Sequence, residues 1–380
     1  MKNIYANPKY LITSAAFLGL ASLFFVTGRA KTVYFRSSET GAGVPKAEKV
    51  AHIATPSAVK AIYMTSWVAG TSDWREDLVK FVDSSELNSM VIDVKDYTGR
   101  VSFETGDPYI KALGASEKRA PDIREFIDYL HAKNIYVIAR ISVFQDPYFV
   151  SRHPEFAVKK KNGAVWKDRK GLTWVDPAAK EFWNYIMLLA KESERAGFDE
   201  LNFDYIRFPS DGNMSDISYD YWNEKTPPAD VLKDFFAYLR RELGGVGVPL
   251  SADLFGMTTV NYDDLNIGQI LENAALYFDY IAPMVYPSHY PTGFNNFKNP
   301  AAHPYEIVNQ AMTVASARLI AASSTPSKLR PWLQDFDLGA AYGAGEIKAQ
   351  MQAVYDAGLT SWMVWDAGNK YTRDAYEAQN

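Results

Sequence analysis

From residue 60 onward, short apolar runs alternate with amphipathic stretches along the chain. Most of the short runs are β-branched or aromatic and apolar on both faces, which is typical of parallel strands covered by helices. These predicted strands are 61–66, 89–95, 135–142, 200–208, 249–255, 280–286, 329–335 and 360–366. Helical patterns lie between them, at 73–87, 121–133, 177–196, 228–243, 265–276, 304–319 and 345–357.

This alternation predicts an α/β fold, a single (β/α)8 TIM barrel over residues 59–380. A doubly wound open sheet is the alternative, but no Gly-rich dinucleotide or P-loop motif follows any of the strands. Zero cysteines exclude disulfides, zinc-thiolate sites, iron–sulfur clusters and a cysteine nucleophile. The formal net charge of −5 argues against a nucleic-acid partner.

The N-terminus predicts a membrane anchor. Tyr10–Val26 is an uncharged run of 17 residues, at the short end of a membrane span, and no A-x-A cleavage site follows it. We therefore expect residues 1–28 to be an uncleaved signal anchor that places the barrel outside the cytoplasm, at the cell surface or in the periplasm. Cleavage would instead give a secreted protein. Residues 29–58 are rich in Pro and Gly and lack apolar periodicity, which predicts a flexible stalk.

Polar residues end most of the apolar strands, where the chemistry of such barrels lies. In ELNFDYIRF (200–208), strand alternation places Asn202 and Asp204 on the face opposite Leu201 and Phe203, toward the barrel interior. By the same argument Asp253 faces inward. The polar strand ends are Asp93, Lys95, Asp96, Arg140, Asp204, Arg207, Asp253, Tyr286, Gln334, Asp335, Trp365 and Asp366.

Asp204 and Asp253 are expected at corresponding depth on adjacent strands, close enough for their titrations to couple. Two carboxylates so placed can flank a glycosidic bond for acid/base or nucleophilic work. The alternative is an ion-pair belt, in which the aspartates only neutralise neighbouring cations. None of the five histidines ends a strand, and no G-x-S-x-G occurs. A carboxylate-only Mg or Ca site at Asp93 and Asp96 has no diagnostic spacing, so neither a metal nor a cofactor is expected.

Residues 60–373 resemble, nearly end to end, an uncharacterised bacterial family of glycoside-hydrolase-like (β/α)8 barrels. The resembling segments are VIDVKDYTGRV (91–101), YVIARISVFQDP (136–147), WKDRKGLTWVDP (166–177), GFDELNFDYIRFPSDG (197–212), PLSADLFG (249–256), YIAPMVYPSHY (280–290), RPWLQDF (330–336) and WDAGNKYT (365–372). The resemblance implies a glycosidase-type activity in which Asp204 is catalytic. Ile206 occupies the place of the chitinase strand-four glutamate, so substrate-assisted chemistry is not implied. Asp366 occupies a place where the family motif has Asn.

We therefore predict a glycosidase that cleaves a cell-envelope or extracellular polysaccharide or oligosaccharide. Asp204 is the predicted nucleophile or base, Asp253 the partner acid and Asp93 the reserve acid. The predicted substrate-binding residues are Trp67, Lys95, Arg140, Arg207, Tyr286, Gln334, Asp335 and Trp365, with Trp67, Tyr286 and Trp365 as sugar platforms. The alternative function is a non-catalytic glycan-binding barrel tethered at the cell surface. The second expected partner, through the N-terminal segment, is the membrane.

Overall fold

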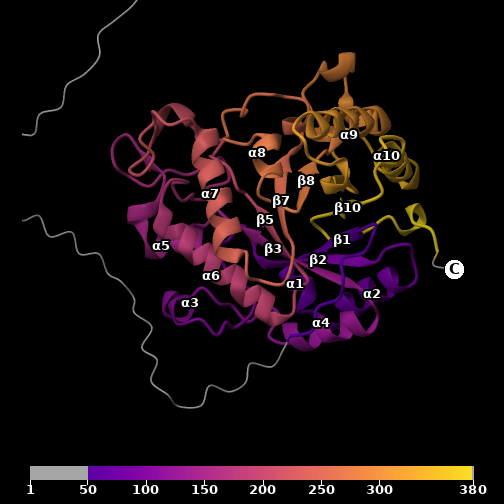
Figure 1. The fold of residues 1–380 in the computed structure, drawn as a ribbon, viewed down its shortest axis with the longest axis horizontal. Helices are drawn as coiled ribbons and strands as arrows, with labels where there is room; N and C mark the ends of the chain where they lie inside the picture. The colour runs from indigo at the N-terminus through magenta and orange to yellow at the C-terminus, as the bar shows by residue number, and fades with distance from the viewer. Residues whose placement is uncertain (1–49, 379–380) are drawn as a thin grey trace, which may run out of the picture. The chain divides into compact units, whose positions relative to one another are not determined.

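Eight parallel strands close into a barrel in the computed structural model, which describes residues 50–378 (Figure 1). In barrel order they are β1 (Lys60–Met64), β2 (Ser89–Lys95), β3 (Tyr136–Ser142), β5 (Glu200–Asp204), β7 (Leu250–Phe255), β8 (Tyr280–Met284), β9 (Trp332–Gln334) and β10 (Trp362–Trp365). β10 pairs with β1 and closes the barrel. The prediction of a single eight-stranded α/β barrel is therefore confirmed.

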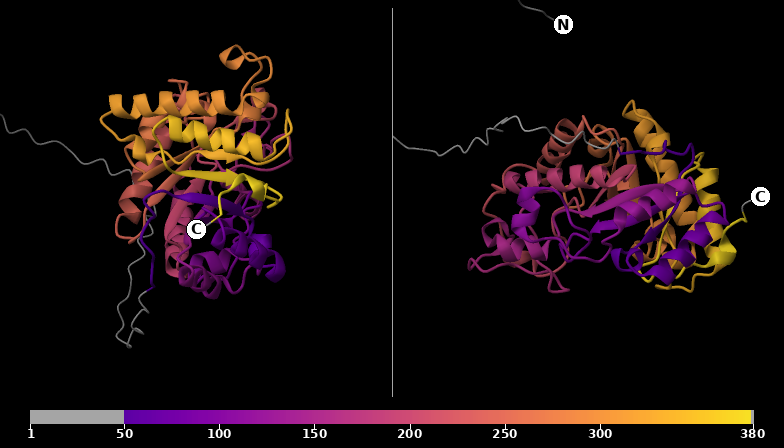
Figure 2. Two further views of the ribbon diagram at one scale, coloured as in Figure 1. Left: turned by 90° about the vertical axis from the view of Figure 1, so that its right-hand side faces the viewer. Right: turned by 90° about the horizontal axis from the view of Figure 1, so that it is seen from below.

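Helices surround the barrel, and α9 and α10 lie side by side on one flank (Figure 2, left). Their bounds are α1 (Ser66–Ala69), α2 (Ser72–Asp83), α3 (Pro108–Leu113), α4 (Ile123–Ala132), α5 (Pro147–Arg152), α6 (Lys180–Ala196), α7 (Pro228–Leu243), α8 (Leu271–Ala275), α9 (Pro304–Ala321) and α10 (Ala344–Asp356). Each predicted helix has a counterpart. α8 is shorter than predicted, because Leu265 and Asn266 adopt left-handed backbone with φ of 54° and 55°, which a helix cannot contain.

The barrel strands separate two apolar cores. Leu201 and Phe203 of β5 belong to the larger core between strands and helices, as strand alternation predicts. Val91, Ile138 and Trp332 belong to a smaller core that fills the barrel interior. The interior is therefore packed with side chains below the ends of the strands, which leaves the C-terminal mouth as the place where polar groups gather.

The N-terminal end of the barrel is closed by a buried ion pair. Arg330 Nη1 donates to Glu200 Oε2 at 2.6 Å, and Tyr136 OH donates to the same oxygen at 3.0 Å. The Arg330 guanidinium also lies 3.1 Å from the centre of the Tyr280 ring. Because each charged group has its partner, the buried ion pair leaves no unpaired charge at this end of the barrel.

Residues 50–58, the last part of the predicted stalk, contact this same end of the barrel. The backbone N–H of Ile53 donates to Asp199 Oδ1 at 2.9 Å, and the hydroxyls of Thr55 and Tyr136 lie 3.1 Å apart. The predicted anchor and the first part of the stalk, residues 1–49, lie outside the described residues. Within residues 50–378, no helix has the length and apolar character needed to cross a bilayer.

The loops that follow β3 and β5 are joined to each other. β4 (Lys159–Lys160) and β6 (Ile217–Ser218) form a small antiparallel sheet between them. In addition, Asp176 accepts hydrogen bonds from the backbone N–H groups of residues 221 and 222 at 2.8 and 3.0 Å. We call residues 143–179 and 205–227 the paired loops. Because they are cross-linked, they form one rigid rim beside the barrel mouth.

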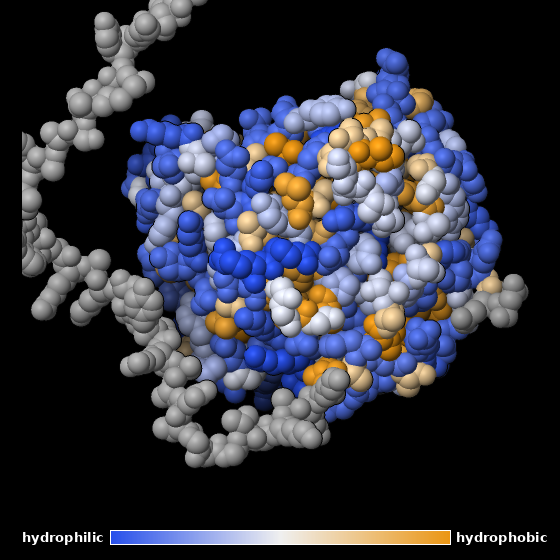
Figure 3. Space-filling view, in the orientation of Figure 1, coloured by the Kyte–Doolittle hydropathy of each residue, from blue (hydrophilic) through white to orange (hydrophobic). Residues whose placement is uncertain are grey.

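The face of the molecule in Figure 3 is mostly hydrophilic, with apolar side chains scattered among polar ones. Scattered exposed apolar residues are ordinary on a folded protein and need no partner to explain them.

A chain that begins at residue 58 is expected to be less stable than one that begins at residue 50. The shorter chain loses the Ile53 hydrogen bond to Asp199, whose side chain is fully buried. Removing a donor from a buried charged group costs about 1–3 kcal/mol of unfolding free energy. Urea unfolding of the two chains measures the difference, and equal midpoints would show that residues 50–57 do not stabilise the barrel.

Candidate active site

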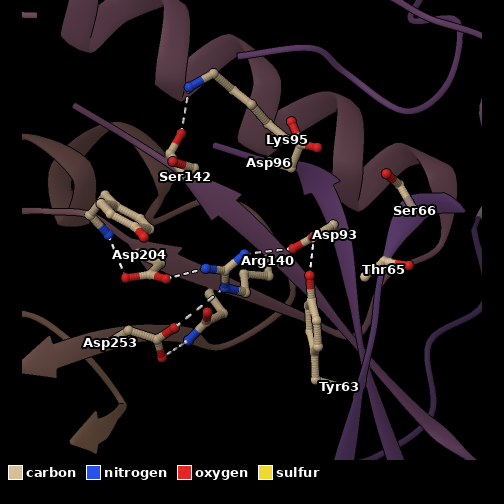
Figure 4. A network of polar contacts seen from close by, with 12 residues as sticks. Tyr63, Thr65, Ser66, Asp93, Lys95, Asp96, Arg140, Ser142, Asp204 and Asp253 are labelled. Carbon is tan, nitrogen blue, oxygen red and sulfur yellow. Dashed lines mark hydrogen bonds and ion pairs between the residues drawn. The ribbon is translucent and has the colours of Figure 1, made fainter. Parts of the chain in front are cut away.

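Three aspartates from different strands meet one arginine inside the barrel mouth (Figure 4). Arg140 Nη1 donates to Asp93 Oδ1 at 2.6 Å, and Nη2 donates to Asp204 Oδ2. Arg140 Nε lies 3.8 Å from Asp253 Oδ2. All four side chains are buried, so the single guanidinium is the shared counter-ion of three carboxyl groups.

The strand register explains this convergence. Asp93 on β2 pairs directly with Arg140 on β3. On β5 and β7, Asn202 pairs with residue 251, so two positions further along Asp204 and Asp253 lie at matching depth. The inward orientation and the matching depth that alternation predicted are thus found in the structure.

Neutral donors satisfy the remaining carboxylate oxygens. Tyr63 OH donates to Asp93 Oδ2. Asp253 Oδ1 accepts from Trp332 Nε1 and Asn202 Nδ2, both at 2.9 Å. Tyr63 and Trp332 were missed in the sequence as site residues because they lie in the middle of apolar runs, where a Tyr or Trp is ordinarily core packing. The signal that could have found them was strand alternation, which places both side chains on the face toward the barrel interior.

Burial in the cluster changes the pKa values of its aspartates and its arginine. Burial, reinforced by the charge of Asp204, raises the pKa of Asp253 to about 8, despite opposing effects of Arg140 and the two hydrogen-bond donors. Burial also raises the pKa of Asp93, against the effects of Arg140 and Tyr63. Burial alone would lower the pKa of Arg140, but Asp204 and Asp93 outweigh it and raise that pKa. Asp253 therefore holds a proton at neutral pH, and Arg140 stays charged.

The backbone directly after Asp204 has an unusual conformation. Tyr205 adopts a left-handed φ of 52°, which is uncommon for a bulky residue and is found at functional sites. Its N–H donates to Asp204 Oδ1 at 2.5 Å. The turn ends β5 at Asp204, four residues earlier than predicted, and carries Arg207 out of the barrel into the paired loops.

Aromatic side chains border the cluster. Trp365 stacks on Tyr63 with ring centres 3.9 Å apart, and its ring centre lies 4.9 Å from the Arg140 guanidinium. Tyr286 is buried, and its pKa is raised by burial and by Asp253 and Asp204, which places it beside both. Trp67 is 59% exposed and lies 4.5 Å from the Arg119 guanidinium. Two predicted sugar platforms thus lie at the cluster, and the third is an exposed ring after β1.

Lys95 is not part of the cluster, contrary to its predicted role in substrate binding. The β2–β3 register shifts between Asp93 and Lys95, so Lys95 turns away from the barrel interior (Figure 4). Its ammonium group is fully buried, 2.8 Å from Asp146 Oδ2 and 2.5 Å from the carbonyl oxygen of Ser142. Burial lowers the pKa of Lys95, and Asp146 opposes that effect. Lys95 therefore fastens the β2 and β3 ends together.

Gln334 and Asp335, which were predicted to bind substrate, are also engaged by the protein itself. Gln334 Oε1 accepts from the Ser288 hydroxyl at 2.8 Å and holds the loop after β8. Asp335 accepts hydrogen bonds from the backbone N–H and the hydroxyl of Thr372, at 2.9 and 2.8 Å. The side chains of Gln334 and Asp335 are both buried. These hydrogen bonds fix loops around the mouth. Within residues 50–378, no three His, Asp or Glu side chains are arranged to hold a metal ion.

Comparison with known proteins places these features in a family context. A family model described as “Putative glycosyl hydrolase domain” matches residues 61–371. A hypothetical protein from Ruminiclostridium thermocellum ATCC 27405 is 36% identical over 50% of this chain and 96% of its own, with a TM-score of 0.47. No curated protein matches.

Two further solved structures resemble the fold at low sequence identity. The glycoside hydrolase domain of PgaB (BpsB) from Bordetella bronchiseptica is 13% identical, with 85% of this chain and 100% of that chain covered and a TM-score of 0.57. The C-terminal domain of a putative chitinase from Desulfitobacterium hafniense DCB-2 is 12% identical, with 84% and 96% covered and a TM-score of 0.50. At such identities the likeness concerns the fold alone.

Replacing Lys95 with Met is expected to destabilise the protein by about 3–5 kcal/mol, because Asp146 is left buried without its partner. Adding Asp146→Asn, which preserves the acceptor that caps α5, should recover part of the loss. The exposed Lys111→Met serves as control. Unfolding in urea measures all four proteins. A Lys95→Met variant as stable as the control would contradict the structural role.

Asp253→Asn is expected to change how stability depends on pH. The folded state keeps a proton on Asp253 up to about pH 8, whereas the unfolded chain releases it near the ordinary value of 3.8. Between these values the folded state binds the extra proton, so wild-type stability falls as pH rises, by about 1.4 kcal/mol per pH unit for one proton. The Asn variant lacks this fall, and its advantage should grow from pH 5 to pH 8. An advantage that stays constant across urea titrations at pH 5, 6.5 and 8 would refute the assignment.

Proposed function

Because the chain belongs to the family described as “Putative glycosyl hydrolase domain”, we propose that it hydrolyses glycosidic bonds in a cell-envelope or extracellular polysaccharide. The observation that supports this most is the placement of Asp253, whose pKa is raised to about 8 by burial and by Asp204, beside the arginine-bound Asp204 at the barrel mouth. Glycoside hydrolysis requires two carboxyl groups with opposite protonation, one as acid and one as nucleophile or base.

In this mechanism Asp253 donates its proton to the glycosidic oxygen of the leaving sugar. Asp204, oriented by Arg140 and by the N–H of Tyr205, acts on the anomeric carbon directly or through a water molecule. Loss of this proton leaves Asp253 as a negatively charged carboxylate. Arg140 Nε has no hydrogen-bond partner among the described residues and lies 3.8 Å from Asp253 Oδ2, so it is placed to stabilise that new charge.

The surrounding rings would hold the sugar. Trp365 and Trp67 offer apolar ring faces near the mouth, and sugar C–H faces pack well on such surfaces. Asp93 is fixed by Tyr63 and Arg140, so its role would be to hold Arg140 in place, with proton donation in reserve.

A non-catalytic glycan-binding barrel is the second candidate. The observation that favours it is burial: Asp93, Asp204 and Asp253 are only 3%, 4% and 1% exposed. In that case the cluster is the ion-pair belt considered above, and sugars would contact only the aromatic rim.

We also propose that residues 1–28 anchor the protein in a membrane, with the barrel outside the cytoplasm. The uncharged run Tyr10–Val26 supports this proposal. An envelope or extracellular glycan would then be within reach of the barrel.

Asp204→Asn and Asp253→Asn are expected to lower kcat by about 10²–10⁴-fold with little loss of glycan binding. The two variants should differ in how their loss of kcat depends on the leaving group of the substrate. With an aryl glycoside, whose leaving group needs no proton, the Asp253→Asn defect should shrink while the Asp204→Asn defect persists. The matched control is Asp128→Asn, on the exposed face of α4. Turnover and binding are measured against envelope and exopolysaccharide glycans. Binding by the wild type without turnover would favour the second candidate.

A further inference from the structure

Arg207 is a cation at the barrel mouth without a carboxylate partner. It follows Asp204 by three residues, it is half-buried, and no carboxylate among the described residues lies within 4 Å of its guanidinium. Only Nη1 is engaged, by the carbonyl oxygen of Phe208 at 3.1 Å and the hydroxyl of Ser210 at 3.0 Å. Nε and Nη2 make no hydrogen bond within the described residues and are not among the buried polar atoms. This edge of the guanidinium is therefore open to solvent.

The guanidinium is held in place although its outer edge is free. It lies 4.8 Å from the ring centre of Trp174 and 5.5 Å from that of Tyr205. Trp174 Nε1 in turn donates to Asp168 Oδ2 at 3.1 Å. A stacked guanidinium with its Nε and Nη2 free is preorganised for two parallel hydrogen bonds to the two oxygens of a carboxylate.

The same buried carboxylate, Asp168, also holds the backbone of a turn that is rich in basic residues. Asp168 Oδ1 accepts from the backbone N–H groups of Lys170 and Leu172, both at 2.9 Å. This fixes the turn that exposes Lys167, Arg169 and Lys170, none of which forms an ion pair among the described residues. Burial and the charge of Lys170 lower the pKa of His289. Lys170 follows β3 and His289 follows β8, so this charge acts across the ends of β5 and β7, where Asp204 and Asp253 lie.

These observations favour an anionic ligand at this side of the mouth. Arg207 and the basic turn place four cationic side chains on this side of the mouth, and none of them forms an ion pair among the described residues. A ligand carboxylate can replace the water at Nε and Nη2 and form two charge-assisted hydrogen bonds there. We propose that Arg207, supported by Lys170, binds the carboxylate of an acidic sugar residue, so that the substrate is a uronate-type or otherwise carboxylated polysaccharide. This inference rests on the proposed glycan function and specifies its substrate class.

Binding by the full-length protein tests the inference independently of turnover. Immobilised carboxylated polysaccharides are compared with the same polymers after reduction of their carboxyl groups, and a phosphate-bearing polymer forms a third arm. The variants are Arg207→Met and a matched control, Arg241→Met, on the exposed end of α7. The wild type and the control should retain a carboxylated polymer at least tenfold more strongly than its reduced form, and Arg207→Met should lose about tenfold of that affinity. The preference should also weaken with added salt.

Several outcomes would overturn the inference. These are equal retention of carboxylated and reduced polymers, failure to retain any carboxylated polymer, and equal behaviour of the Arg207 and Arg241 variants. Retention of the phosphate-bearing polymer alone would show that the group bound by Arg207 is a phosphate and not a carboxylate. If acidic polymers are bound through Arg207 but never cleaved, the glycosidase proposal fails while the ligand assignment stands. If the protein cleaves neutral glycans and Arg207→Met has no effect, the ligand assignment fails while the glycosidase proposal stands.

Discussion

The barrel mouth depends on one guanidinium that serves three buried carboxyl groups. Arg140 donates to Asp93 and Asp204 and lies near Asp253. One positive charge cannot neutralise three negative charges in a site from which water is largely removed, and the least costly solution is to retain a proton. The aspartate that makes no hydrogen bond to Arg140 is the one whose pKa rises to about 8. The separation of acid from base follows from this shortage of counter-ions.

Barrel closure is what imposes the shortage. The β2–β3 and β5–β7 registers bring all four side chains to neighbouring depths, and Trp332 fills the interior beneath Asp253. Trp332 and Asn202 donate to one Asp253 oxygen, which leaves the other toward Arg140 Nε. The neutral donors therefore orient Asp253 without supplying the charge that would deprotonate it. A second arginine at the position of Trp332 would satisfy the aspartate and remove the acid.

The sequence predicts the barrel and the inward aspartates well, because both follow from period-two alternation and from the order of strands and helices. It fails where the backbone departs from regularity. Lys95 shares a predicted face with Asp93, but the register shift between them turns it into a buried pair with Asp146. The strand predicted to run to residue 208 ends at Asp204, because Tyr205 is left-handed, so Arg207 lies in the paired loops. Neither a bulge nor a left-handed tyrosine has a propensity signal, since tertiary contacts impose both.

Four cations of the barrel, Lys95, Arg330, Arg140 and Arg207, have two kinds of environment. Lys95 and Arg330 are saturated by carboxylate and carbonyl oxygens outside the aspartate cluster, where a charge serves only to hold elements together. Arg140 and Arg207 each keep a donor beside the mouth that no protein group accepts among the described residues: Arg140 Nε is buried near Asp253, and Nε and Nη2 of Arg207 have only water as a partner. An unsatisfied donor is a cost to the folded state, and it is kept where a transient or external partner relieves it. For Arg140 that partner is the Asp253 anion, which exists only after the proton has left. For Arg207 no carboxylate of the described chain lies within ion-pair distance, and the proposed partner is a carboxylate of the ligand.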